Sequence, residues 1–144
     1  MFKGVIFDLD GTVYNGAAEV PGVSRFVHRL VEHGIRYQFV TNRANRRPGA
    51  VVRQLRGFGI PCRTENVLTS AQATALYLKK GRAFIVGEDG LRAALEERGF
   101  TITDQHPDYV ISSFDTHLTY AKLARRATSS TAAPGSSPRT RTSA

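Results

Sequence analysis

Short apolar runs alternate with amphipathic segments along most of this chain, and that alternation limits the possible folds more than any other feature of the sequence. Apolar runs of strand length predict strands, and segments with apolar residues at helical spacing, bounded by Gly or Pro, predict helices. The predicted strands span residues 3–7, 35–40, 83–86, 100–103 and 109–111, and the predicted helices span residues 21–33, 48–56, 70–80 and 89–98. Strands that alternate with helices indicate right-handed βαβ units, so we expect an α/β protein whose parallel sheet has helices on both faces.

The composition is typical of a folded protein that does not enter a membrane. The 144 residues, 41% of them apolar, suffice for a hydrophobic core. No run approaches the roughly 20 apolar residues of a membrane span, and residues 1–7 lack the features of a signal peptide, so we expect a cytoplasmic protein. The single cysteine, Cys62, cannot form an internal disulfide, and we expect a buried, unreactive thiol.

The formal net charge of +8 raises nucleic acid as a partner, but the distribution of the charge argues against it. The excess is almost entirely arginine, spread over predicted helix faces and the C-terminal tail without the interleaved aromatic residues of single-strand binders. We therefore expect no nucleic-acid partner. One local cluster of arginines follows the second predicted strand, and it either attracts a phosphorylated substrate or forms a solvated helix face. It consists of Arg43, Arg46, Arg47, Arg53 and Arg56.

Two carboxylates follow the first predicted strand, in the stretch FDLDGTVY. If the strand continues through them, Asp8 and Asp10 point the same way because side chains alternate along a strand, and their repulsion requires a cation nearby. Thr41 and Asn42 follow the second predicted strand. In open parallel sheets, ligands bind beyond the carboxyl ends of the strands. We therefore expect these four residues to meet at one edge of the sheet.

Carboxylates in this position can act on phosphate esters. One carboxylate can attack phosphorus and form an aspartyl-phosphate, which divides a difficult hydrolysis into two displacements. Because the nucleophile and the phosphate are both anions, a hard dication such as Mg²⁺ has to bridge them. The second carboxylate can donate a proton to the leaving oxygen, and Gly11 permits a turn whose backbone N–H groups bind phosphate. An isolated pair of this kind is usually a solvated turn, so its spacing to Thr41 and Asn42 is what makes it informative.

The sequence DLDGT after an apolar strand, followed one βα unit later by VTN, resembles the haloacid dehalogenase superfamily of phosphatases. The resemblance implies that Asp8 is the nucleophile and a Mg²⁺ ligand. It also implies that Asp10 is the general acid and base and binds Mg²⁺ through its backbone carbonyl. Thr41 and Asn42 would then orient the phosphate, and Arg43 is the neighbour expected to contact substrate.

Further stretches resemble the NagD-type and p-nitrophenylphosphatase-like subfamily, among them VLTSAQATALYL, AFIVGEDGLRAALEERGFTITD and PDYVISSFDTHLTYAKLARRA. This resemblance implies a Rossmann-like core at residues 1–80, followed by the first part of an inserted α/β cap at residues 81–127. It also implies a small phosphorylated substrate, such as a sugar phosphate, a nucleotide or a phosphoglycolate-like compound. A homo-oligomer formed through the cap is a candidate assembly.

Two motifs of that family are missing from the sequence. The family has a lysine beyond the cap that holds the phosphate, and a later Gly-Asp motif that completes the metal site; neither is found here. We therefore expect a truncated copy of the enzyme with little or no activity. Residues 128–144 contain no large apolar residue, so we expect them to be disordered, and we interpret them as an out-of-frame reading of a GC-rich gene.

Three functions remain open from the sequence. The leading one is a Mg²⁺-dependent phosphomonoester hydrolase, present here as an incomplete copy. The second is a non-catalytic fragment that binds phosphate or pairs with another subunit, which the missing motifs favour. The third is a receiver-like module in which one aspartate accepts a phosphoryl group as a signal, and the cap-like second half of the chain argues against it.

Overall fold

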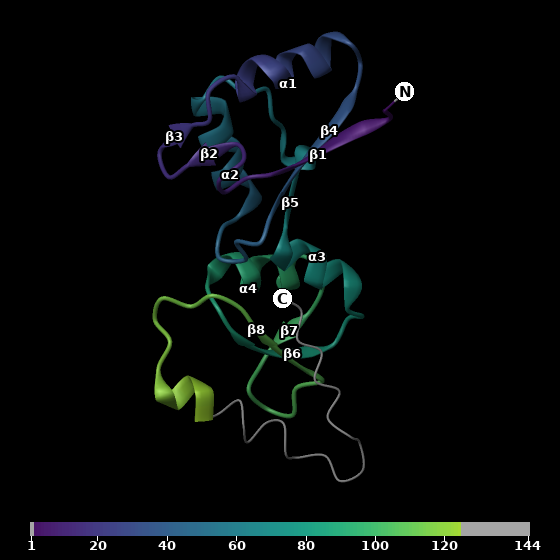
Figure 1. Ribbon diagram of the computed structural model, residues 1–144. Helices are drawn as coiled ribbons and strands as arrows, with labels where there is room; N and C mark the ends of the chain where they lie inside the picture. The colour runs from purple at the N-terminus through teal and green to yellow at the C-terminus, as the bar shows by residue number, and fades with distance from the viewer. Residues whose placement is uncertain (1, 125–144) are drawn as a thin grey trace.

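Two small parallel sheets organise the part of the chain that the computed structural model describes, residues 2–124 (Figure 1). The first sheet has the strand order β1-β4-β5 and the second has the order β7-β6-β8, and every pair within them is parallel. The strands are β1 (Gly4–Asp8), β4 (Arg36–Thr41), β5 (Val67–Thr69), β6 (Arg82–Val86), β7 (Thr101–Ile102) and β8 (Tyr109–Ser112). The predicted α/β class with parallel sheets is confirmed.

Helices α1 (Val23–Glu32) and α2 (Pro48–Gly57) cover the same face of the first sheet. The crossovers from β1 to β4 and from β4 to β5 step across the sheet in one direction, and right-handed crossovers that advance in one direction place their helices on one side. The apolar side chains of both helices pack on the strand residues that face them. This first core contains Phe7, Val27, Leu30, Phe39, Val51, Leu55 and Val67.

The opposite face of the first sheet is only partly covered in the described part of the chain. Phe7 is 9% exposed, whereas Ile6, which strand alternation places on the opposite face, is 73% exposed. The prediction of helices on both faces is therefore wrong for this sheet within residues 2–124, where α1 and α2 lie on one face. An apolar run predicts a strand, but it does not show how many of its faces are covered, because that depends on elements distant in sequence.

Helices α3 (Ser70–Tyr77) and α4 (Asp89–Glu96) pack against each other on the second sheet and lie between the two sheets in Figure 1. This second core contains Ala44, Ala71, Ala75, Ala83, Leu91, Ala94, Leu95 and Phe100. Helix α3 precedes residue 80, where the sequence predicts the end of the core, yet it contributes side chains to the second core. The division into residues 1–80 and 81–127 stays a prediction.

Four short elements escape the sequence prediction. The segment after the aspartate pair, expected to be a loop, contains an antiparallel hairpin of β2 (Tyr14–Asn15) and β3 (Ala18–Glu19). The 3₁₀ turn η1 (Thr64–Asn66) leads into β5, which has only three residues. Elements of this length contain too few residues to show a hydrophobic period.

The helices agree with the sequence prediction except near their ends, where boundaries are least certain. Helix α1 begins at Val23 instead of Pro21, and α3 ends at Tyr77 instead of Lys80. Residues 120–124 are also helical, whereas the tail at residues 128–144 lies outside the described residues. Within residues 2–124, no helix combines the length and apolar character needed to cross a membrane.

The single thiol is part of the first core. Cys62 is 4% exposed, and burial raises the pKa of its thiol to about 11, so the thiolate is scarce at neutral pH. The nucleophilic form of cysteine is the thiolate. The predicted burial of this residue is confirmed.

Two leucines on helices test how much the first core stabilises the fold. Leu55 is fully buried and Leu76 on α3 is 54% exposed. We expect Leu55→Ala to lower the free energy of unfolding by about 2–5 kcal/mol, because it removes buried methyl groups and leaves a cavity. We expect Leu76→Ala, the matched control, to change it by about 0.5 kcal/mol. Urea denaturation followed by circular dichroism measures both, and equal losses would contradict the core assignment.

Candidate active site

Two neighbouring parallel strands end at the same edge of the first sheet. In the pairing of β1 with β4, Asp8 lies opposite Val40, so the carboxyl ends of the two strands are adjacent. Asp8 is the last residue of β1 and is exposed, whereas Thr41, the last residue of β4, is 5% exposed. Asn42 and Arg43 follow directly and are exposed. The residues that the sequence singled out therefore lie in two adjacent segments.

Asp10 lies two residues beyond the end of β1, in an isolated bridge with Tyr14 that encloses a tight turn. The backbone N–H of Tyr14 donates to the carbonyl of Leu9 at 3.2 Å, and the N–H of Gly11 donates to the carbonyl of Tyr14 at 2.9 Å. Gly11 has a φ of +85°, in the left-handed region that favours glycine. Strand alternation therefore does not set the direction of the Asp10 side chain.

An ion pair sets the direction of the Asp10 carboxylate. Nη2 of Arg43 lies 3.0 Å from Oδ1 of Asp10, and the two side chains are 50% and 32% exposed. A cationic partner for the aspartate pair is thus present within the chain. Because exposed ion pairs of this kind contribute little free energy, the guanidinium can exchange Asp10 for another anion at small cost.

The segment after β4 is held by its own backbone and by the start of α3. The N–H of Arg43 donates to Oγ1 of Thr41 at 3.1 Å, and the hydroxyl of Ser70 donates to the carbonyl of Asn42 at 2.8 Å. Both contacts fix backbone atoms of residues 41–43, so the exposed side chains of Asn42 and Arg43 project from a defined turn.

Thr69 and Gln72 fix the start of α3 beside this turn, and the sequence analysis missed both. The N–H of Gln72 donates to Oγ1 of Thr69 at 3.2 Å, and the N–H of Thr69 donates to Oε1 of Gln72 at 3.0 Å. This reciprocal capping box places Thr69 next to Thr41, its partner in the β4–β5 pairing. The signal was present, since a threonine followed three residues later by glutamine is typical of a capped helix start.

Tyr14 is a buried neighbour of Asp10. Its side chain is 2% exposed, and burial, followed by the charge of Asp10, raises the pKa of its phenol. The guanidinium groups of Arg46 and Arg43 oppose that rise. The phenol therefore stays neutral at neutral pH and adds no further negative charge to the site.

Most of the predicted arginine cluster is committed to contacts within the chain. The contacts are Arg43 with Asp10, Arg46 with Gln54, Arg47 with Asp89, and Arg56 with the carbonyl of Cys62. These contacts order the loop and the helix that follow β4, and Arg43 leaves positive charge close to the carboxyl ends of the strands. Attraction of a phosphorylated substrate by this cluster stays a prediction.

The polar groups at this edge include two carboxylates that could serve a metal ion, those of Asp8 and Asp10. Within residues 2–124, no cluster of three or more His, Cys, Asp or Glu side chains is arranged to hold a metal. Mg²⁺ is commonly bound through one or two carboxylates, with waters and substrate phosphate as the other ligands. The residues at this edge fit that pattern.

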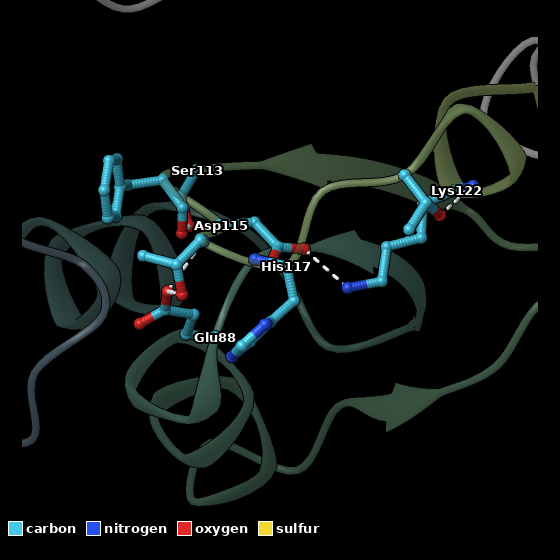
Figure 2. A network of polar contacts seen from close by, with 8 residues as sticks. Glu88, Ser113, Asp115, His117 and Lys122 are labelled. Atoms are coloured by element: carbon cyan, nitrogen blue, oxygen red, sulfur yellow. Dashed lines mark hydrogen bonds and ion pairs between the residues drawn. The ribbon is translucent and has the colours of Figure 1, made fainter.

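A second polar network lies at the start of α4 and after β8, within the second unit, which consists of the second sheet with α3 and α4 (Figure 2). Glu88 accepts hydrogen bonds from the N–H and the hydroxyl of Thr116, at 2.8 and 2.6 Å. Asp115 accepts hydrogen bonds from Nζ of Lys122 at 2.9 Å and from the N–H of His117 at 2.8 Å, and these contacts lower its pKa. Asp115 and Lys122 also line a cavity of about 390 Å³, but each already has a partner of opposite charge. The network therefore stabilises the connection after β8.

The capping box gives a direct test of how the turn is supported. We expect Thr69→Val to lower the free energy of unfolding by about 1 kcal/mol, because it keeps the side-chain shape but removes the oxygen that accepts from the N–H of Gln72. Thr101→Val, at an exposed position of β7, is the matched control and should have almost no effect. Thermal denaturation measures both variants. A similar loss for the two would show that the cap is unimportant.

Comparisons with known proteins identify the family of this chain. The family model described as haloacid dehalogenase-like hydrolase matches residues 5–101. A 5'-nucleotidase of Bacillus subtilis is 39% identical over 127 residues, which cover 85% of this chain and 50% of that protein. An acid sugar phosphatase of Staphylococcus haemolyticus is 39% identical over 128 residues, covering 85% and 49%.

Solved structures show the same likeness in three dimensions. NagD from Escherichia coli matches with a TM-score of 0.82 at 29% identity, covering 88% of this chain and 52% of that one. A 4-nitrophenylphosphatase from Thermotoga maritima matches with a TM-score of 0.80 at 32% identity, covering 85% and 49%. The chain spans about half the length of the curated relatives it matches. Because the family model covers most of the described residues, this chain belongs to the haloacid dehalogenase-like hydrolase family.

Proposed function

We propose that the chain carries the nucleophile and phosphate-binding part of a Mg²⁺-dependent phosphomonoester hydrolase. One observation carries this proposal. Two carboxylates lie beside the turn at residues 41–43, where two adjacent parallel strands end. Open parallel sheets bind ligands at that position. The names of the relatives, a 5'-nucleotidase and an acid sugar phosphatase, support phosphate esters as substrates.

In the proposed reaction, Asp8 and Asp10 have different tasks. A carboxylate oxygen of Asp8, exposed at the end of β1, forms a bond to phosphorus as the bond to the leaving oxygen breaks, which gives an aspartyl-phosphate. Asp10 donates a proton to the leaving oxygen. It then accepts a proton from the water that attacks phosphorus and releases phosphate. Before substrate binds, the ion pair with Arg43 holds the Asp10 carboxylate at this edge, and Asp10 carries the transferred proton once Arg43 has exchanged this contact for one with the phosphate.

Thr41, Asn42 and Arg43 bind the phosphate in this proposal. The Thr41 hydroxyl accepts a hydrogen bond from the N–H of Arg43, so its own hydrogen is directed elsewhere and can serve a phosphate oxygen. The Asn42 amide supplies further donors from the fixed turn. The Arg43 guanidinium can exchange its exposed contact with Asp10 for the phosphate, with which it forms a stronger charge-assisted hydrogen bond.

Asp8, through its carboxylate, and Asp10, through its backbone carbonyl, would hold Mg²⁺. When bound, the ion offsets the repulsion between the nucleophile and the phosphate. The proposed substrate is a small phosphorylated metabolite, of the sugar phosphate, nucleotide or phosphoglycolate-like type, rather than a nucleic acid or a membrane lipid. We also propose a cytoplasmic protein, with which its single unpaired thiol is compatible, and a homo-oligomer formed through the second unit.

A non-catalytic role is the second candidate, in which the chain binds phosphate or pairs with another subunit. Within residues 2–124, no third acidic side chain joins Asp8 and Asp10 in a metal-binding cluster. Ile6, on the opposite face of the first sheet, and Phe2, four positions before it, are 73% and 87% exposed, as at a surface that meets another chain. These observations favour weak phosphate binding without rapid turnover for the 144-residue polypeptide.

Phosphate binding at the strand ends is tested by removing one charge and one hydroxyl. We expect the double variant Asp8→Asn, Thr41→Ala to lose binding of inorganic phosphate in the presence of Mg²⁺, measured by isothermal titration calorimetry. The matched control removes an exposed carboxylate and hydroxyl from η1 with Glu65→Gln and Thr64→Ala, and should bind as the unchanged protein does. Unaltered binding by the first variant would place the phosphate elsewhere.

Turnover separates the two candidates. We expect the purified chain to hydrolyse p-nitrophenyl phosphate at least about 10²-fold more slowly than a full-length relative, because loss of even one transition-state donor commonly costs that much. Lys122 forms its ion pair with Asp115, away from residues 41–43 in sequence. Rapid turnover that Asp8→Asn abolishes would contradict this expectation and establish the chain as an enzyme in its own right.

A further inference from the structure

The loop at residues 44–46, directly after the proposed phosphate turn, touches the second unit through Gly90. A Cβ at position 90 would lie 2.5 Å from the carbonyl oxygen of Ala44, 2.6 Å from the carbonyl carbon of Asn45 and 2.8 Å from the nitrogen of Arg46. All three are backbone atoms, which cannot rotate away as a side chain can. Glycine is therefore required here for the close approach of the first turn of α4 to the loop.

The loop is also anchored in the second core. Ala44 is 6% exposed and packs among residues of α3, α4 and the second sheet, although it follows a strand of the first sheet. Only two residues separate Ala44 from Thr41. A shift of its backbone therefore passes directly to Arg43, whose N–H donates to the Thr41 hydroxyl.

An ion pair between Arg47 and Asp89 is a further contact between this loop and α4. Nε and Nη2 of Arg47 donate to Oδ2 and Oδ1 of Asp89 at 2.7 and 3.0 Å, which is a bidentate arrangement. Both side chains are more than half exposed, so the pair adds little stability, but its two parallel hydrogen bonds define an orientation. Glu88 accepts hydrogen bonds from Thr116 and from the side chain of Asn45, which lower its pKa and tie the loop to α4 a third time.

We propose that the start of α4, through Gly90 and Asp89, positions the loop at residues 42–47, so that the second unit sets the geometry of the phosphate site. This inference rests on the proposed function for the location of that site. Gly90, Asp89 and Arg47 are positioning residues in this account, since they act through the backbone of the turn and not through contact with phosphate.

The main test compares two glycine-to-alanine variants of the full chain. Gly90→Ala forces the loop and α4 apart, whereas Gly57→Ala, at the end of α2, meets open space. Inorganic phosphate is titrated in the presence of Mg²⁺ while backbone amide signals are followed by NMR. We expect Gly90→Ala to weaken phosphate binding by about tenfold or more and to shift the amides of residues 41–46, because small displacements of binding groups are costly. Gly57→Ala should bind as the unchanged protein does.

A double-mutant cycle separates positioning from direct contact. We expect Arg47→Gln and Asp89→Asn each to weaken phosphate binding by about threefold, and the double variant to bind no more weakly than either, as for residues that act as one unit. Arg92→Gln, which removes the Arg92–Glu96 pair on the same helix, is the matched control and should have no effect. If Arg47→Gln weakens binding equally with and without Asp89, Arg47 contacts phosphate itself and the positioning role is overturned.

Each remaining outcome also decides the question. A folded Gly90→Ala variant with unchanged phosphate affinity and unchanged amide signals overturns the proposal; if that variant does not fold, the cycle decides. If the unchanged protein binds no phosphate at residues 41–43, the proposed function fails. Hydrogen exchange of the amides at residues 42–46 then tests the contact between the loop and α4 alone. The positioning role is supported if these amides exchange about tenfold faster in Gly90→Ala than in Gly57→Ala, or in Asp89→Asn than in Arg92→Gln. Equal exchange rates in both comparisons overturn it.

Discussion

The parallel pairing of β1 with β4 is the interaction on which the rest of this structure depends. Its register places Asp8 opposite Val40, so the first strand and its neighbour finish at the same edge of the sheet. The turn after β1 and the turn after β4 then lie side by side, and Arg43 reaches Asp10. A slip of one residue in this pairing would turn the apolar face of β1 away from the first core and separate the two turns.

The support for that edge comes from both halves of the chain. Ser70, at the start of α3, holds the carbonyl of Asn42, and the first turn of α4 packs on the loop two residues further along. Helix α3 follows a strand of the first sheet but contributes Ala71 and Ala75 to the second core. The two sheets are therefore joined by packing as well as by the chain, and the polar turn is held between them.

Much of this arrangement could be predicted from the sequence, for reasons specific to each residue. The apolar run before Asp8 and the helical spacing around Leu30 and Leu55 identified a strand and two helices, because both patterns are local. The positions of Asp8 and Thr41 at strand ends predicted that they would meet, because parallel strands finish at one edge. The direction of Asp10 could not be predicted in this way, since it depends on where β1 ends and on the partner that its carboxylate finds.

By itself, the sequence determined the order and type of the main elements, the parallel character of the pairing and the residues that lie at the carboxyl ends of the strands. Only the tertiary structure decided which faces were covered, that Ile6 would be exposed, and that Ala44 would belong to the second core. It also decided the close approach of Gly90 to the loop. The physical reason is the distance in sequence between the residues involved. Hydrophobic period and capping depend on residues a few positions apart. Burial and backbone contacts, such as that of Gly90 with Ala44, depend on residues that the fold brings together from distant parts of the chain.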